Sequence, residues 1–276
     1  ISLPLGTIME SDLLIVGAGI TAATLCAKLK DRYKITVVET RSHLGGNCYD
    51  YSSSGTLIHQ YGPHIGHFPN PTIVEFLGQY TGWIPYTHSV TAEVNVKGNL
   101  RRCSFPYSKQ AAQELGGVLS PEEVIETFFK GYSQKMWGQP WDKLPASITG
   151  RVPKDTNERP IYFPNQFVGM PDRGYTAMMT KMFDGVELIL GAPANLWTTL
   201  ETKRIVYCGR PDRVPVRNDP ARRVYGNLAR SSLGAHWLAY RSLDLTWQLQ
   251  DWDVPTPVLN FRDAAHPYTR VTPDAS

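Results

Sequence analysis

The sequence lacks any concentration of positive charge. Its 276 residues carry a net charge of only +3, and lysine and arginine never occur in runs longer than two. Proteins that bind nucleic acids usually gather such residues into a basic patch or stripe. The composition therefore excludes nucleic acid as an expected partner, and individual arginines become more informative than any basic surface.

Cysteine pairs and long apolar segments are also missing. The four cysteines, Cys26, Cys48, Cys103 and Cys208, show neither CxxC nor metal-ligand spacing, so we expect buried reduced thiols and a cytoplasmic location. No apolar run approaches the length of a membrane span, so no membrane is expected among the partners. Residues 1–8 lack the basic and apolar parts of a signal peptide, and we interpret them as a leader outside the fold.

A nucleotide-binding motif is present near the start, in "DLLIVGAGITAATLCAKLKDRYKITVVET". This stretch predicts strand, tight turn, helix and strand, with Gly17, Gly19 and Ala22 in the GxGxxA pattern that lets a phosphate approach the backbone. The helix N-terminus attracts the phosphate, and Glu39 can accept a ribose hydroxyl. We predict an adenine-dinucleotide site, with an empty glycine turn as the alternative. The following pair Gly45–Gly46 resembles FAD-binding proteins more than NAD dehydrogenases.

Histidines follow in H-x4-H-x2-H spacing as His59, His64 and His67. This spacing suggests a metal site, but a glycine and a proline break any helix that would align them, and no carboxylate accompanies them. We therefore favour histidines that line a polar pocket by hydrogen bonds.

The rest of the chain gives a coarse order of elements. A hairpin is predicted around Lys97–Asn99, a helix after Ser120, and another helix near Tyr175. At the end of the first helix, one of Phe128 and Phe129 belongs to the core, whereas Tyr132 or Trp137 can stack on a ligand. The segments "GVELILGA" and "RIVYCGR" predict short strands that return to the first sheet, "TPVLNF" predicts a strand of a second sheet, and residues 211–230 predict an exposed connection.

Several longer motifs occur in a fixed order: "LGGNCYD", "YGPHIGH", "FFKGYSQKMWG", "LPASITGRVP", "YFPNQFVGMPDRGYTAM", "YRSLDL" and "PYTR". Over nearly all of residues 12–272 the chain resembles the UDP-galactopyranose mutase family. This resemblance implies an isomerase that interconverts pyranose and furanose forms of a nucleotide-bound hexose. It also implies an α/β fold with a Rossmann-like domain (9–85 and 183–212), a reduced helical insert (106–150) and an antiparallel β-sheet substrate domain (86–105, 151–182 and 231–276).

The resemblance also implies roles for single residues. Those expected to bind substrate are Tyr132 on the base, Trp137, Tyr162, Phe163, Phe128 and Asn165. Those expected to act in catalysis are Arg151 and Arg270 at the diphosphate and sugar, and His64 and His67 beside the flavin ring. Those expected to hold the cofactor are Gly17, Gly19, Ala22, Glu39, Arg41, Gly45, Gly46 and Asn47.

The cofactor itself is left between two alternatives. In the family, reduced flavin attacks the anomeric carbon and expels the nucleoside diphosphate. This chain departs from the family pattern: family members continue past "PYTR", the segment between Phe105 and Phe128 is short, and Gly66 stands where a bulky aromatic is usual. It is similar in this to a smaller branch of mutases, GDP-sugar mutases included, that use a divalent metal without flavin. We therefore expect a flavin-independent mutase assisted by Mg²⁺ or Mn²⁺, with reduced FAD as the alternative.

Other assignments stay open at this point. The metal ligands are unassigned; Asp244 and Asp263 are candidates, although each is more often a surface or turn acid. The substrate is a UDP- or GDP-hexose, and the short helical insert leaves the oligomeric state open. A non-catalytic nucleotide-sugar binder and an FAD oxidoreductase are the remaining alternative functions.

Overall fold

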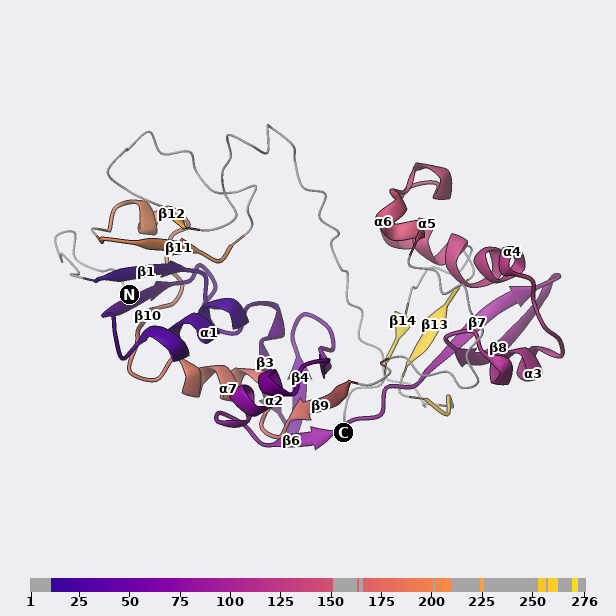
Figure 1. The fold of residues 1–276 in the computed structure, drawn as a ribbon, viewed down its shortest axis with the longest axis horizontal. Coiled ribbons are helices and arrows are strands. Elements are labelled where there is room, and N and C mark those ends of the chain that lie inside the picture. Colours follow the sequence, from indigo (N-terminus) through magenta and orange to yellow (C-terminus); the bar gives the residue numbers. More distant parts are fainter. Residues whose placement is uncertain are drawn as a thin grey trace.

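The computed structural model describes residues 11–150, 163, 166–200, 202–209, 224–225, 253–256, 258–262 and 270–272. Its elements form two bodies, which Figure 1 shows beside each other along the longest axis. The first body contains a parallel sheet, and the second contains a sheet covered by short helices.

The first body is built on a five-stranded sheet with the order β10-β2-β1-β11-β12. Every neighbouring pair is parallel. The strands are β1 (Leu13–Val16), β2 (Ile35–Val38), β10 (Glu187–Ile189), β11 (Ile205–Tyr207) and β12 (Val224–Tyr225). The predicted returns of β10 and β11 are confirmed. However, Val224 and Tyr225 form an edge strand inside the segment that was expected to be an exposed connection.

Both faces of this sheet are covered, which explains the unbroken apolar runs of β1 and β2. Leu13 and Ile15 pack against α1 (Ile20–Leu29) and α7 (Gly174–Met182), while Leu14 faces the other side with Trp197 and Ile205. Trp197 belongs to the 3-10 turn η4 (Leu196–Thr198). Alternate side chains of one strand thus enter two separate cores.

Smaller elements complete the first body. They are η1 (Gly46–Cys48), the hairpin β3 (Asp50–Ser53) and β4 (Thr56–His59), α2 (Pro71–Gly78), and a sheet of β5 (Gly66–Phe68), β9 (Phe167–Pro171) and β6 (Trp83–Pro85). The assignment of residues 166–182 to the substrate domain is wrong, because β9 pairs with β5 and β6 and the methionines of α7 lie in the core beneath β1.

The second body contains a four-stranded sheet with the order β14-β13-β7-β8. Its strands are β7 (Val90–Val96), β8 (Asn99–Phe105), β13 (Leu259–Phe261) and β14 (Arg270–Val271). The predicted hairpin β7–β8 is confirmed. The sheet was predicted to be antiparallel, as β7–β8 and β13–β14 are, but β13 runs parallel to β7, so the sheet is mixed.

Short helices follow β8 and share a core with its sheet. They are α3 (Lys109–Leu115), α4 (Pro121–Val124), the π-helical segment η2 (Ile125–Lys130), α5 (Gly131–Trp137), η3 (Trp141–Lys143) and α6 (Ala146–Thr149). Ser120 and Glu123 form the capping box that begins α4. Phe128 packs with Val94 and Phe105 in this core, so the helical insert and the hairpin share one hydrophobic core.

Candidate functional site

Two glycine turns, Gly17–Gly19 and Gly45–Gly46, meet where the parallel strands end. Gly17 has φ of +100° and follows β1, and its N–H donates to the Val38 carbonyl at 2.8 Å. Gly45 N–H donates to the Ala18 carbonyl at 2.8 Å, and a Cβ added to Gly46 would lie 3.0 Å from the Gly19 Cα. The two turns therefore pack backbone against backbone beside the N-terminus of α1, and a side chain on Gly46 would be crowded there.

Polar groups surround these turns. One oxygen of Glu39 accepts the Ala18 N–H and the other accepts the Arg41 N–H, both at 2.8 Å. Arg41 also donates from Nη2 to Asn47 Oδ1 at 3.0 Å, and its guanidinium lies 4.4 Å from the Tyr61 ring centroid. Oε1, which accepts the Arg41 N–H, also accepts the Thr40 hydroxyl at 3.2 Å. Oε2 accepts only the Ala18 N–H among the described contacts, so this oxygen retains a lone pair for a ribose hydroxyl.

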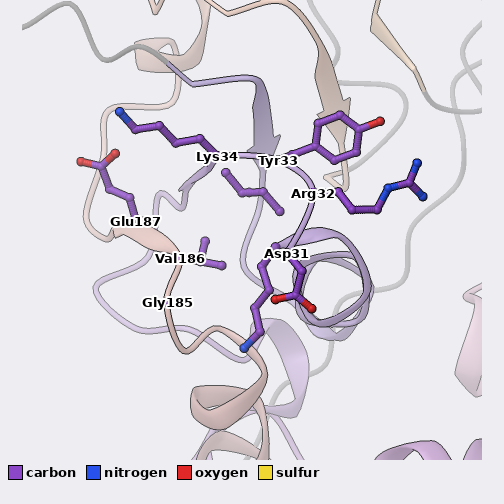
Figure 2. A pocket seen from close by; sticks show the side chains of 9 residues that line it. Asp31, Arg32, Tyr33, Lys34, Gly185, Val186 and Glu187 are labelled. Carbon is purple, nitrogen blue, oxygen red and sulfur yellow. The ribbon is translucent and has the colours of Figure 1, made fainter.

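All eight residues expected to hold a cofactor thus lie in one region, with Ala22 fully buried under the turn. The carboxyl ends of β1, β2 and β11 converge there, and open parallel sheets bind their ligands at this edge. A cavity of about 420 Å³ lies elsewhere, among residues 30–35 and 185–187 (Figure 2). It lies where β2 and β10 begin, at the opposite edge of the sheet, so we do not assign the nucleotide to it.

The predicted histidines have separate partners. His64 Nδ1 lies 2.8 Å from the Gly62 carbonyl, His67 Nδ1 lies 3.2 Å from Gln166 Oε1, and the His59 ring meets Tyr175 edge-on. In the described parts of the chain, no group of three or more His, Cys, Asp and Glu side chains could hold a metal. His64 and His67 thus have polar partners and His59 has a ring contact, and the polar-pocket interpretation stays a prediction.

A stack of rings joins His67, through Phe163, to His88, a residue that the sequence analysis did not single out. Phe163 lies parallel to His67 at a centroid distance of 4.1 Å and stacks on His88 at 5.4 Å. Burial, and to a smaller extent the nearby charges of Arg270 and His67, lower the pKa of His88 to about 4. Phe163, His67, His88 and Arg270 therefore form one group, which we call the histidine stack. A lone histidine before a strand carries no sequence signal for such a role.

The aromatic residues at the end of the second predicted helix divide between core and surface. Phe128 is fully buried between Phe105 and Tyr107, so its assignment to the substrate site is wrong: the π-helical segment turns its ring into the core. Tyr132 is half-buried, and Trp137 is 38% exposed. These two side chains remain able to contact a ligand.

Several predicted residues lie outside the part of the chain that the structure describes. They are Arg151, Tyr162 and Asn165 of the expected site and the metal candidates Asp244 and Asp263. Among the helices that the structure does describe, none is both long and apolar enough to cross a membrane.

Comparison with known proteins agrees with this geometry. The sequence pattern of the UDP-galactopyranose mutase family matches residues 127–273, and that of an NAD(P)-binding Rossmann-like domain matches residues 15–80. A probable UDP-galactopyranose mutase of Klebsiella pneumoniae is 30% identical over 95% of this chain and 73% of its own length. A dTDP-fucopyranose mutase of Escherichia coli is 29% identical over 95% of this chain and 76% of its own length.

A solved structure is similar over the same extent. A crystal structure of reduced UDP-galactopyranose mutase aligns with a TM-score of 0.59 over 95% of this chain and 70% of that one. Their sequence identity is 12%, so this likeness shows the shared fold. The resemblance found in the sequence motifs is thereby confirmed, and the chain belongs to the UDP-galactopyranose mutase family, a family of nucleotide-sugar isomerases.

Proposed function

We propose that this protein interconverts the pyranose and furanose forms of an NDP-hexose, with a flavin dinucleotide held by the two glycine turns. The observation that carries the cofactor assignment is the backbone-to-backbone contact of Gly19 and Gly46 beside Glu39. A Cβ on Gly46 would be crowded against the Gly19 Cα at 3.0 Å, and the amide groups at the start of α1 can bind a phosphate. The residues present therefore fit the adenine half of FAD.

This assignment differs from the flavin-independent mechanism that the sequence departures favoured. A phosphate-bound Mg²⁺ needs only one or two carboxylates from the protein, and none of the described residues carries a specific argument for one. In contrast, the residues expected to hold the cofactor lie together, and hydrogen bonds join Glu39, Arg41 and Asn47 and connect the two glycine turns. Reduced flavin, when bound, supplies the nucleophile for the anomeric carbon.

The protein side chains would bind and orient the nucleotide sugar. We place the base on Tyr132, the diphosphate near Arg270, and the sugar beside the histidine stack. Hydrogen bonds to charged groups contribute about 1.5–3 kcal/mol each. Arg151 and Arg270 together would therefore stabilise the transition state by about 3–6 kcal/mol. Enzymes lower such barriers by at least about 8 kcal/mol. The two arginines alone supply less than this, so the mechanism needs a nucleophile or a metal besides them.

The first test is turnover with a panel of UDP-, GDP- and dTDP-hexoses. The protein is stripped with EDTA and then supplied with reduced FAD or with Mg²⁺ or Mn²⁺. We expect furanose product with reduced FAD and none with metal alone. Product with metal alone would replace the flavin assignment by the metal-assisted mechanism. Binding without product under both conditions would indicate a nucleotide-sugar binder, and flavin reduction by the sugar would indicate an oxidoreductase.

A further inference from the structure

A buried arginine lies between two aromatic rings in the second body. The Cζ atom of Arg262 is 3.9 Å from the Phe105 ring centroid and 4.1 Å from the Tyr132 centroid, and the residue is only 4% exposed. Its Nη1 donates to the Phe128 carbonyl at 3.5 Å. Phe105 ends β8, Tyr132 lies on α5 and Arg262 follows β13, so the sandwich joins three elements that Figure 1 shows together in the second body.

The arrangement is held from both sides. Arg262 N–H donates to the Glu93 carbonyl on β7 at 2.9 Å, which fixes its backbone to the sheet. Lys135, one helical turn after Tyr132, donates from Nζ to the Phe261 carbonyl at 2.9 Å. The end of β13 is therefore attached to β7, to η2 before Tyr132 and to α5 after it, so Arg262 is held beside the Tyr132 ring.

Packing alone does not require an arginine at this position. Taking a charge out of water is costly, and a well-packed apolar side chain of similar volume is often equally stable or more so. What arginine adds is a flat cation that attracts the face of an aromatic ring, a geometry that lysine does not reproduce. Arg262 therefore contributes something that an apolar side chain would not: a planar positive charge against one face of the Tyr132 ring.

Tyr132 is only half-buried although one face is covered by Arg262. Part of this residue thus remains accessible to solvent, as a residue that stacks on a ligand requires. We propose that Arg262 is the positioning residue for nucleobase recognition: it supports the rear face of Tyr132 so that the opposite face receives the base of the NDP-sugar. This inference rests on the proposed function, in which Tyr132 stacks on the base.

The test is the affinity of Arg262→Leu for UDP, GDP and dTDP compared with its affinity for inorganic pyrophosphate, which has no base. We expect the nucleotides to bind about 3- to 10-fold more weakly, the range of one cation–π contact. Pyrophosphate affinity and the melting temperature are expected to stay as in wild type. A merely structural role would not separate the nucleotides from pyrophosphate. Arg102→Leu removes an exposed charge from the same sheet and is the matched control, expected to change neither affinity.

A second variant covers failure of the first to fold. Arg262→Lys keeps the charge but loses the planar group, and the same selective weakening is expected. Unchanged nucleotide affinity in the folded variant would overturn the inference, and equal weakening for pyrophosphate would overturn it in favour of a direct phosphate contact. Tyr132→Ala distinguishes failure of the Arg262 inference from failure of the proposed base site. If wild type binds no nucleotide, or if Tyr132→Ala binds nucleotides as tightly as wild type, the base site at Tyr132 itself is contradicted.

Discussion

At the scale of single residues, the same residue type has opposite surroundings in this protein. His64 and His67 each have a hydrogen-bond partner at their Nδ1 atoms. His67 and His88 both stack on Phe163, but burial and the nearby charge of Arg270 lower the pKa of His88 to about 4. The surroundings of His88 therefore favour its neutral form.

The stability of the protein should depend on pH through His88. Its folded pKa of about 4 is below the ordinary value of 6.5. Between these pH values the unfolded chain binds a proton that the folded protein does not, so stability is full above pH 6.5 and falls as the pH is lowered towards 4. We expect the free energy of unfolding of wild type to fall by about 1 to 3 kcal/mol more over this pH range than that of His88→Gln. The measurement is urea unfolding at several pH values, and parallel curves for both proteins would contradict it.

At the scale of elements, α7 is capped from a distant part of the chain. Asp50 is 2% exposed, and its carboxylate accepts the N–H groups of Tyr175 at 2.6 Å and Thr176 at 2.9 Å. Gly174 precedes them with φ of +85°, and a Cβ there would lie 2.7 Å from Asp50 Oδ2. The helix begins at Gly174 because this carboxylate satisfies its first free amides.

Removing this cap should cost more than removing a local one. We expect Asp50→Ala to lower the free energy of unfolding by about 3 kcal/mol, since it leaves two buried N–H groups without their acceptor. Asn70→Ala is the control: Asn70 caps α2 at an exposed position, where the loss is about 1 kcal/mol. Chemical denaturation followed by circular dichroism measures both. Equal losses would show that Asp50 is no more than an ordinary cap.

Local patterns predicted many of these elements, but not their partners. The hairpin turn at Lys97–Gly98, the capping box at Ser120 and the glycine turn at Gly17 each depend on neighbours within a few residues, and the structure contains all three. The cap of α7 joins residues 125 positions apart. The parallel pairing of β13 with β7 is equally remote, and no periodicity within "TPVLNF" indicates the direction of its neighbour.

At the scale of the whole molecule, the candidate site draws on both bodies. The glycine turns lie in the first body, whereas Tyr132 and Arg262 lie in the second. The histidine stack takes His67 from β5 and Arg270 from β14, with His88 in the connection between β6 and β7. Cofactor and base are therefore assigned to different bodies, with the histidine stack drawing on both.

Cofactor binding should raise the stability of the molecule by mass action. A ligand at one hundred times its dissociation constant stabilises the folded state by about 2.7 kcal/mol, so we expect FAD to raise the melting temperature of wild type. Gly46→Ala should remove most of this increase, because its Cβ would lie 3.0 Å from Gly19 Cα.

The matched control for this variant is Gly55→Ala. Gly55 also has a positive φ, of 84°, but has nothing within 4 Å of its added Cβ. Gly55→Ala should therefore also place an alanine at positive φ but keep the full FAD response, as followed by thermal unfolding with and without the flavin. An increase retained in Gly46→Ala, or absent from wild type, would show that the glycine turns do not hold the flavin.

The sequence by itself determined the features that depend on short-range order: the dinucleotide motif from Gly17 to Glu39, the family motifs, and the helix starts after Gly19, after Ser120 and near Tyr175. Tertiary structure alone decided that Phe128 is core, that α7 belongs to the first body, and that Arg262 lies behind Tyr132. The physical reason is that burial and stacking depend on which distant surfaces meet. A pattern along the chain records the shape of one element, and only the packed fold determines what that element faces.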